Sequence, residues 1–190
     1  MELVFATTSD KKFLHMQRDL LPHGIALRHI KMDLPEPRSY DLKEIARSKV
    51  LFAYDQLGIP CIAHDSGFYI PSIGGFPRTF VNFAMETIGL EGILRLVDGK
   101  DRACEFQDCL AYCDGAEPVF FESNAKGTLS MEPRGTFTEE MPIPLWLIFV
   151  PKGYDKTLAE FTKAEYRKYR EEGKNHGYKN KFIEWIKMNP

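Results

Sequence analysis

The sequence has no long apolar run and no strong excess of either charge. Its longest apolar run, residues 144–150, has the length of a strand, whereas a membrane-spanning helix needs roughly 18 apolar residues, so we expect no membrane partner. The formal net charge of −2 argues against a basic protein that binds nucleic-acid polymers. The first residues have no basic stretch and no cleavage-type motif of small residues, so we expect no signal peptide.

The sequence also has few cysteines and no internal repeat. The four cysteines form no C-x-x-C pair, and no histidine pair lies near them at ligand spacing, which argues against zinc and favours a reduced, cytoplasmic protein. No repeat, low-complexity tract or linker divides the chain. With 44% hydrophobic and 27% charged residues, we expect one folded domain over residues 1–190.

The order of apolar patterns predicts an α/β fold with a mixed sheet. The run Leu3–Ala6 predicts a strand, Lys11–Leu21 has helical periodicity, and Ile25–Ile30 predicts a second strand. Two long strands joined by a turn at Asp114-Gly115 predict a hairpin. Further helices are expected over 42–57, 78–86, 90–97, 158–172 and 182–188, and strands over 60–63, 103–113, 118–127 and 145–150.

A candidate phosphate site lies between the first strand and the first helix. Thr7, Thr8 and Ser9 precede Lys11 and Lys12. The free N–H groups and positive dipole end of a helix N-terminus bind phosphate, and hydroxyls and lysines add donors and charge. The alternative is an ordinary capped helix with exposed lysines.

Two carboxylates form a candidate magnesium site. Glu36 lies in a loop with a proline on each side, and Asp65 lies just past the strand 60–63. Loops at strand ends line the ligand crevice of an open α/β sheet, and Mg²⁺ binds one or two carboxylates together with phosphate oxygens. Lys49 is five residues from Glu44, not an ideal ion-pair spacing, so it is a second candidate for phosphate. The alternatives are surface or capping roles for the acids and solvent exposure for Lys49.

Aromatic residues offer a possible base-stacking surface, although packing in the core is the favoured interpretation for most of them. These residues are Phe68, Phe76, Phe80, Phe83 and Trp146.

Taken in order, these segments resemble the inosine triphosphate pyrophosphatases, which remove deaminated purine nucleoside triphosphates. The family's D-L-P-E loop matches residues 33–36, and its E-I-x-x-x-K motif matches residues 44–49. Its (E/D)-D-(T/S)-G-L motif corresponds to residues 64–68, and L-G-G-x-P-G to the turn at residues 74–77.

The resemblance implies a fold, a reaction and a set of site residues. The fold is a mixed, elongated β-sheet with flanking helices, two lobes around a central cleft, and a homodimer. The reaction is Mg²⁺-dependent hydrolysis of a nucleoside triphosphate to the monophosphate and pyrophosphate. By position, Asp65 is the metal ligand and water-activating base, and Glu36 is the second metal ligand. The implied phosphate- and substrate-binding residues are Thr7, Thr8, Ser9, Lys12, Lys49, Ser66, Trp146 and His176.

The chain departs from the family motifs mainly at positions that contact the base and phosphates. The T-G-N phosphate loop is Thr7-Thr8-Ser9, and His64 replaces the acid before Asp65. Residues 144–148 replace the base-reading F-G-(Y/W)-D-P segment, and Asn175-His176-Gly177 replaces S-H-R. We therefore expect altered base recognition. One alternative is a nucleotide-binding or sensing subunit with impaired catalysis; another is a scaffold that keeps only the fold.

Overall fold

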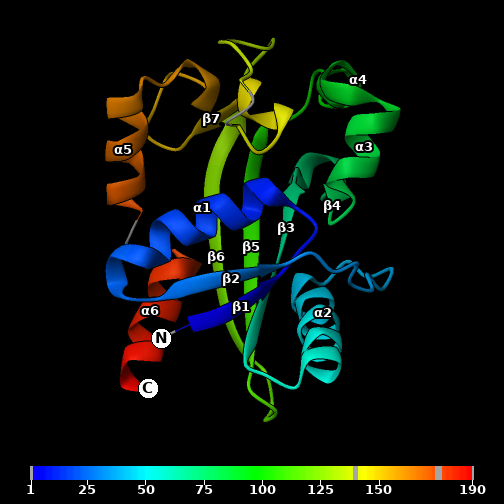
Figure 1. Cartoon of the computed structure of the whole chain (residues 1–190). Helices are drawn as coiled ribbons and strands as arrows, with labels where there is room; N and C mark the ends of the chain where they lie inside the picture. Colours follow the sequence, from blue (N-terminus) through cyan, green and yellow to red (C-terminus); the bar gives the residue numbers. More distant parts are fainter. Residues whose placement is uncertain (1, 139–140, 174–176, 190) are drawn as a thin grey trace. The chain divides into compact units, whose positions relative to one another are not determined.

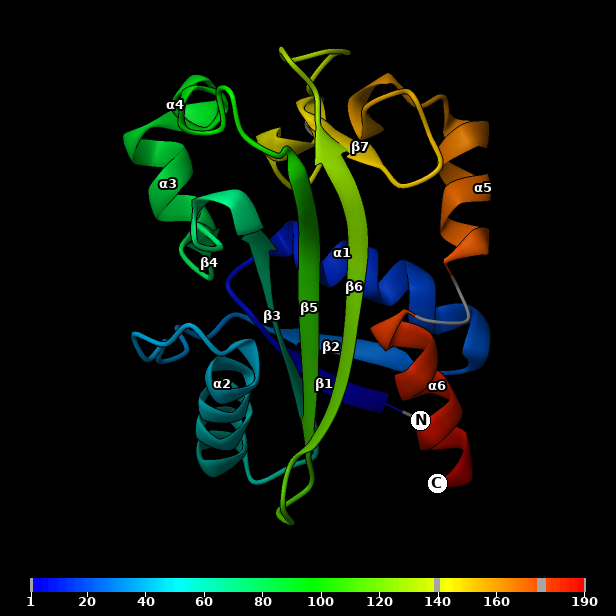
Figure 2. The ribbon, with the colours of Figure 1, turned by 180° about the vertical axis from the view of Figure 1, so that it is seen from behind.

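The computed structural model describes residues 2–138, 141–173 and 177–189 (Figures 1 and 2). The strands are β1 (Glu2–Ala6), β2 (Ala26–Ile30), β3 (Cys61–Tyr69), β4 (Pro77–Arg78), β5 (Ala103–Cys113), β6 (Val119–Leu129) and β7 (Phe149–Pro151). The α-helices are α1 (Asp10–Leu20), α2 (Leu42–Leu57), α3 (Val81–Thr87), α4 (Gly89–Leu96), α5 (Lys163–Glu172) and α6 (Tyr178–Met188). Short 3₁₀ helices are η1 (Leu21–His23), η2 (Pro71–Ile73), η3 (Pro144–Leu147) and η4 (Leu158–Glu160).

One mixed sheet contains the strands, which confirms the predicted α/β class. The order is β2-β1-β3-β5-β6-β7, and β4 pairs with β3. β1 runs parallel to β2, with Leu3 opposite Leu27, and parallel to β3, with Phe5 opposite Ile62. The pairs β3–β4 and β6–β7 are antiparallel. As predicted, β5 and β6 are neighbours in the sheet, and both are long (Figure 2).

The described residues divide into two compact units. Unit 1 contains residues 2–66, 108–123 and 177–189, and unit 2 contains residues 67–107, 124–138 and 141–173. The strands β3, β5 and β6 contribute residues to both units. Two units agree with the two predicted lobes. The cleft and the single functional domain over 1–190 stay predictions.

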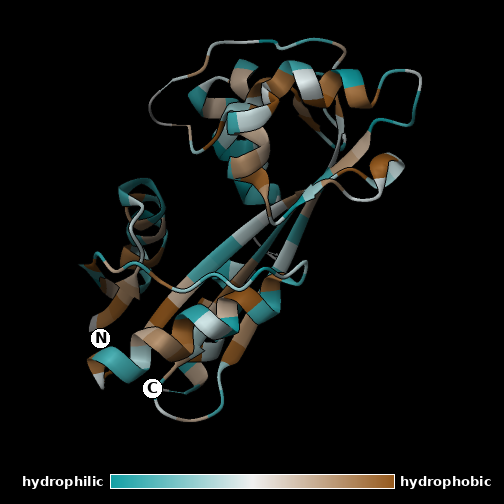
Figure 3. Cartoon of the chain, turned by 90° about the vertical axis from the view of Figure 1, so that its right-hand side faces the viewer, coloured by the Kyte–Doolittle hydropathy of each residue, from teal (hydrophilic) through white to brown (hydrophobic). Residues whose placement is uncertain are grey.

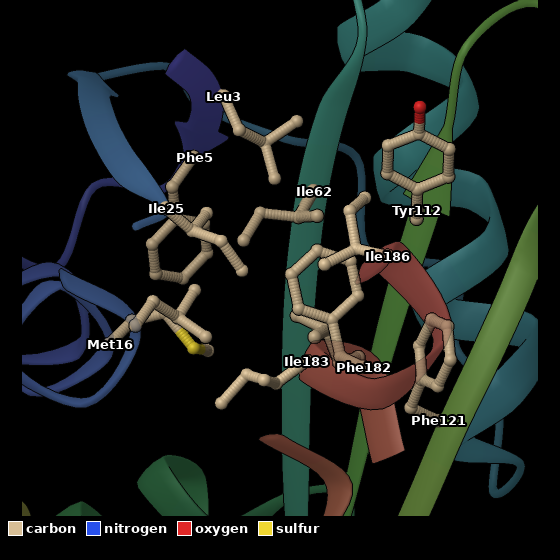
Figure 4. Close-up of a cluster of buried hydrophobic side chains, with 12 residues drawn as sticks. Leu3, Phe5, Met16, Ile25, Ile62, Tyr112, Phe121, Phe182, Ile183 and Ile186 are labelled. Carbon is tan, nitrogen blue, oxygen red and sulfur yellow. The ribbon is translucent and has the colours of Figure 1, made fainter. Parts of the chain in front are cut away.

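The core of unit 1 joins segments from both ends of the sequence. Figure 4 shows Phe182, Ile183 and Ile186 of α6 packed with Leu3 and Phe5 of β1. Hydrophobic and hydrophilic residues both occur along the helices, as expected for helices with one buried face (Figure 3). The other buried members of this cluster are Met16, Leu20, Ile25, Ile62, Leu110, Tyr112 and Phe121. Within the described residues, no helix has the length and apolar character to cross a membrane.

Unit 2 corrects two predicted elements. Residues 145–150 were expected to form a strand, but η3 begins at Pro144 and only a short β7 follows. The helix expected over 158–172 is divided into η4 and α5, because Thr162 caps α5 by accepting a hydrogen bond from the amide of Glu165. The Glu165 carboxylate in turn accepts from the amide of Thr162, which completes a capping box.

Two further predicted helices begin elsewhere. α6 begins at Tyr178, earlier than the expected residue 182. α3 begins at Val81 instead of Arg78, because Pro77 and Arg78 form β4 against β3.

Candidate active site

Helix α2 places a lysine in the interior of unit 1. Asp41 caps the helix by accepting a hydrogen bond from the amide of Lys43 at 2.8 Å, and Gly58 ends it in the left-handed conformation. Lys49 follows Ile45 and precedes Ala53 by four residues each, so it lies on the same buried helix face. The predicted helix boundaries 42–57 are confirmed. The alternative interpretation, that Lys49 is exposed to solvent, is wrong.

Strand β3 supplies Asp65, and its extent differs from expectation. The apolar run ends at Ala63, so Asp65 was expected in a loop past the strand. β3 instead continues to Tyr69, where it pairs with β4. Asp65 lies past Ile62, the last residue of β3 paired with β1, and it is buried. A carboxylate inside a strand has a fixed backbone, which makes its position better defined than one in a loop.

Lys49 connects the two predicted metal ligands. Its Nζ lies 2.7 Å from Asp65 Oδ1 and 2.6 Å from Glu36 Oε1. The side chains of Lys49 and Asp65 are 7% and 11% exposed, while that of Glu36 is 67% exposed. Burial opposes the charge on Lys49, but attraction to Asp65 and hydrogen bonds to both carboxylates outweigh it and raise the Lys49 pKa. Lys49 therefore stays an ammonium ion.

A second lysine approaches the same carboxylate from α1. Lys12 Nζ lies 4.0 Å from Asp65 Oδ1. Ser9 caps the helix, since its hydroxyl accepts a hydrogen bond from the amide of Lys12, and Thr7 Oγ1 accepts from the amide of Ser9. Desolvation is the main cause of the lowered Lys12 pKa; Lys49 lowers it further, while Asp65, Asp108 and Glu36 oppose the shift. Thr8 is exposed at this helix start.

His64 and Asp108 form a pair beside this group. His64 Nε2 lies 3.1 Å from Asp108 Oδ1, and the imidazole stacks on Tyr178 with ring centroids 4.8 Å apart. Burial lowers the His64 pKa, although the hydrogen bond to Asp108 opposes this effect. Sequence reasoning missed Asp108 and Tyr178. A signal for Asp108 in the sequence was a charged residue directly before the apolar run 109–113.

The remaining predicted residues fall in different places. Ser66 follows Asp65 in β3 and is half-buried. Trp146 belongs to η3 of unit 2, where its ring lies 5.2 Å from that of Tyr166. His176 lies outside the described residues. Among the predicted stacking aromatics, Phe68 is fully buried in the core, as the packing interpretation expected, whereas Phe83 is exposed.

The two carboxylates are oxygen donors of the kind that Mg²⁺ binds. Glu36 and Asp65 both contact Lys49 Nζ, so the two side chains are close enough to share a ligand, and the exposure of Glu36 leaves access for water. Mg²⁺ commonly binds through one or two carboxylates and fills its other positions with water and substrate phosphate. Among the described residues there is no group of three or more histidines, cysteines or acids suited to hold a metal. A site here would thus depend on water and phosphate as further ligands.

Unit 1 therefore gathers Lys12, Glu36, Lys49 and Asp65 from α1, the loop before α2, α2 and β3. Two lysine side chains beside two carboxylates offer contacts for phosphate together with anionic ligands and a proton acceptor. Such a combination suits hydrolysis of a phosphate anhydride.

Comparison with known proteins identifies the same family along nearly the whole chain. The model of the Ham1 family matches residues 3–175. A dITP/XTP pyrophosphatase of Methanopyrus kandleri is 35% identical over 191 residues, covering 100% of this chain and 98% of its own. One of Saccharolobus solfataricus is 34% identical, covering 86% and 83%. The Staphylococcus aureus Ham1 protein has the same fold, with a TM-score of 0.79 and 19% identity over 100% of both chains. This chain therefore belongs to the Ham1 family.

Proposed function

We propose that this chain is an enzyme that hydrolyses a nucleoside triphosphate to the monophosphate and pyrophosphate, and that it requires Mg²⁺. The observation that carries the proposal is the group Lys12, Glu36, Lys49 and Asp65 in a member of the Ham1 family. The names of the Methanopyrus and Saccharolobus relatives support a noncanonical purine triphosphate such as dITP or XTP as substrate. We further propose that residues 1–190 act as one domain in a cytoplasmic homodimer.

In the proposed reaction, each residue has a separate task. Lys12 and Lys49 bind the phosphate chain and offset its negative charge, with Thr7, Thr8 and Ser9 at the start of α1 as further donors. Asp65 accepts a proton from the attacking water. The oxygen of that water bonds to the α-phosphorus, and pyrophosphate leaves. A bound Mg²⁺, held by Glu36 and Asp65, would offset phosphate charge and lower the pKa of water. Ser66, Trp146 and His176 are proposed to contact the nucleotide.

The decisive experiment measures pyrophosphate release from dITP, XTP, ITP and the standard triphosphates, with and without Mg²⁺. We expect turnover that requires the metal and that Asp65→Asn abolishes. The far-UV circular dichroism of the variant should match the wild type, which separates loss of chemistry from loss of fold. No turnover of any triphosphate at high enzyme concentration would contradict the proposal.

Base recognition is proposed to differ from that implied by the family motifs. Residues 144–148 contain no aspartate where the family has F-G-(Y/W)-D-P, and no arginine follows His176. We expect a weaker preference for the deaminated purines over dATP and dGTP. A strong preference for dITP or XTP, measured as a ratio of kcat/KM values, would contradict this part of the proposal.

A second candidate function is nucleotide binding without hydrolysis. Threonine at position 8, where the family motif has glycine, favours it, because glycine permits a closer approach of the backbone to phosphate. Calorimetry that detects nucleotide binding in the absence of any pyrophosphate release would support this alternative.

A further inference from the structure

The neighbouring strand β2 holds the segment that leads from β1 into α1. The amide of Thr7 donates a hydrogen bond to the carbonyl oxygen of Ile30 at 3.1 Å. On the other side of the same residue, His29 Nε2 lies 2.9 Å from the Thr7 carbonyl oxygen. Because a carbonyl oxygen only accepts hydrogen bonds, the imidazole donates through Nε2. Both polar backbone groups of Thr7 are therefore fixed by β2, at the first residue of the candidate phosphate segment 7–9.

The imidazole of His29 is itself held in place. It is 15% exposed and stacks on Phe13 of α1, with ring centroids 4.4 Å apart and ring planes 8° from parallel. Its other nitrogen, Nδ1, lies 3.7 Å from Asp10 Oδ1. Contacts on the face of the ring and at both nitrogens therefore fix the direction in which Nε2 donates.

The hydrogen bond from His29 determines where the next backbone amide points. The Thr7–Thr8 peptide bond is trans, so its C=O and N–H groups point in opposite directions. The Thr8 N–H therefore points away from His29. Thr8 is exposed, and within the described part of the chain its N–H donates to no group. A backbone donor is thus free just before α1, at the end of the helix where the dipole favours anions.

We propose that His29 is a positioning residue for phosphate binding, because it holds the Thr7–Thr8 peptide with the Thr8 N–H available to the phosphate chain. This inference rests on the proposed function, in which the start of α1 contacts the substrate phosphates. Without the imidazole donor, the peptide is free to rotate. A rotated peptide presents the Thr7 carbonyl oxygen, which repels phosphate, in place of the N–H donor.

Calorimetric titration of the full chain with inorganic pyrophosphate, in the presence of Mg²⁺, tests the proposal. His29→Phe keeps an aromatic ring against Phe13 and removes the donor, so pyrophosphate should bind about 5-fold more weakly. His29→Gln loses the ring but retains an N–H donor, and it should bind pyrophosphate nearly as tightly as the wild type.

Gln17→Met is the matched control for a role in stability alone. Gln17 Oε1 accepts a hydrogen bond from the amide of Leu27 at 2.7 Å, so Gln17 also ties α1 to β2, but from the second half of the helix. Its replacement should lower the urea midpoint without changing the affinity for pyrophosphate. Equal weakening of pyrophosphate binding by Gln17→Met and His29→Phe would overturn the inference.

Thr8→Pro tests the donor itself, and it decides the question if His29→Phe does not fold. Proline has no N–H, and the Thr8 amide makes no hydrogen bond within the described residues that the change would break. Thr8→Pro should bind pyrophosphate about as weakly as His29→Phe, and the double variant should bind no more weakly than Thr8→Pro. Thr8→Ala keeps the N–H and should bind more tightly than Thr8→Pro.

Weaker binding by His29→Phe and Thr8→Pro, with binding like the wild type by Gln17→Met, supports the inference. If either of the first two variants binds pyrophosphate as tightly as the wild type, the inference is overturned, and it falls alone if the wild type hydrolyses triphosphates. A wild type that neither binds pyrophosphate nor hydrolyses any triphosphate overturns the proposed function as well.

Discussion

Replacing Lys49 with methionine should strongly destabilise unit 1. Methionine retains the length and apolar packing of the lysine stem but removes the ammonium group. Asp65, which is 11% exposed, then loses a charged partner at 2.7 Å. Glu36 also loses its contact, but it is 67% exposed and water replaces the lysine there. The cost therefore comes almost entirely from the buried carboxylate.

The expected magnitude follows from the geometry that remains. Breaking a buried ion pair from one side costs about 3–5 kcal/mol, because an uncompensated charge stays in the interior. Lys12 Nζ still lies 4.0 Å from the same oxygen and offsets part of that charge. We therefore expect a loss of about 3 kcal/mol, which corresponds to a drop in Tm of roughly 6–12 °C for a chain of this size.

Urea denaturation monitored by tryptophan fluorescence and circular dichroism measures this loss as a lower midpoint at an unchanged slope. The control is Lys31→Met, the same substitution in an exposed pair whose partner is Asp10. It should not measurably move the midpoint, because exposed ion pairs contribute little. In the Lys49→Met background, Asp65→Asn should recover part of the lost stability. A midpoint for Lys49→Met equal to that of Lys31→Met would refute the argument.

Three further predictions concern other parts of the chain. All four cysteines are buried, and burial raises the pKa of Cys61, Cys104 and Cys109 to about 12. The native protein should therefore react with fewer than one equivalent of a thiol reagent at pH 8, whereas the denatured protein should react with four. The hydrogen bond from Lys156 is the largest cause that lowers the Glu165 pKa, to about 2, so the contribution of Glu165 to the free energy of unfolding is present above about pH 4.5 and is lost as the pH falls through 2. The difference in urea midpoint between the wild type and Glu165→Gln should therefore shrink as the pH falls from 4.5 to 2. A difference that stays constant over this range would contradict the prediction. Thr157→Val should cost about 1–3 kcal/mol, since the buried hydroxyl donates to the Arg134 carbonyl, whereas Thr157→Ser should cost much less in the same denaturation assay.

Local patterns predicted those elements of the fold that carry their own signals. α2 has a capping aspartate, a periodic apolar face and a terminal glycine, and its boundaries are as predicted. The run 145–150 is apolar, but apolarity alone does not distinguish a strand from a 3₁₀ turn that begins at Pro144. The separation of η4 from α5 depends on reciprocal bonds between Thr162 and Glu165, a capping box that lay inside a longer helical pattern.

The candidate site shows a similar division. Motif resemblance identified Lys12, Glu36, Lys49 and Asp65 as separate candidates, and the structure brings these four together; their catalytic roles stay predictions. Sequence alone did not show that Lys49 contacts both carboxylates, because this depends on how α2 packs against β3. Asp108 escaped notice because its partner, His64, is 44 residues away.

The core of unit 1 has a consequence for how the protein is made. Leu3 and Phe5 are synthesised long before Phe182 and Ile186, which complete the cluster around them (Figure 4). During translation the apolar face of β1 and β2 therefore stays uncovered until α6 has been synthesised. Contacts between residues so far apart in the sequence also form slowly. Until α6 covers it, this exposed face can bind chaperones or aggregate. A nuclease that cut the message before the codons for α6 would thus yield a nascent chain that contains Lys12, Glu36, Lys49 and Asp65 but lacks the helix that completes their core.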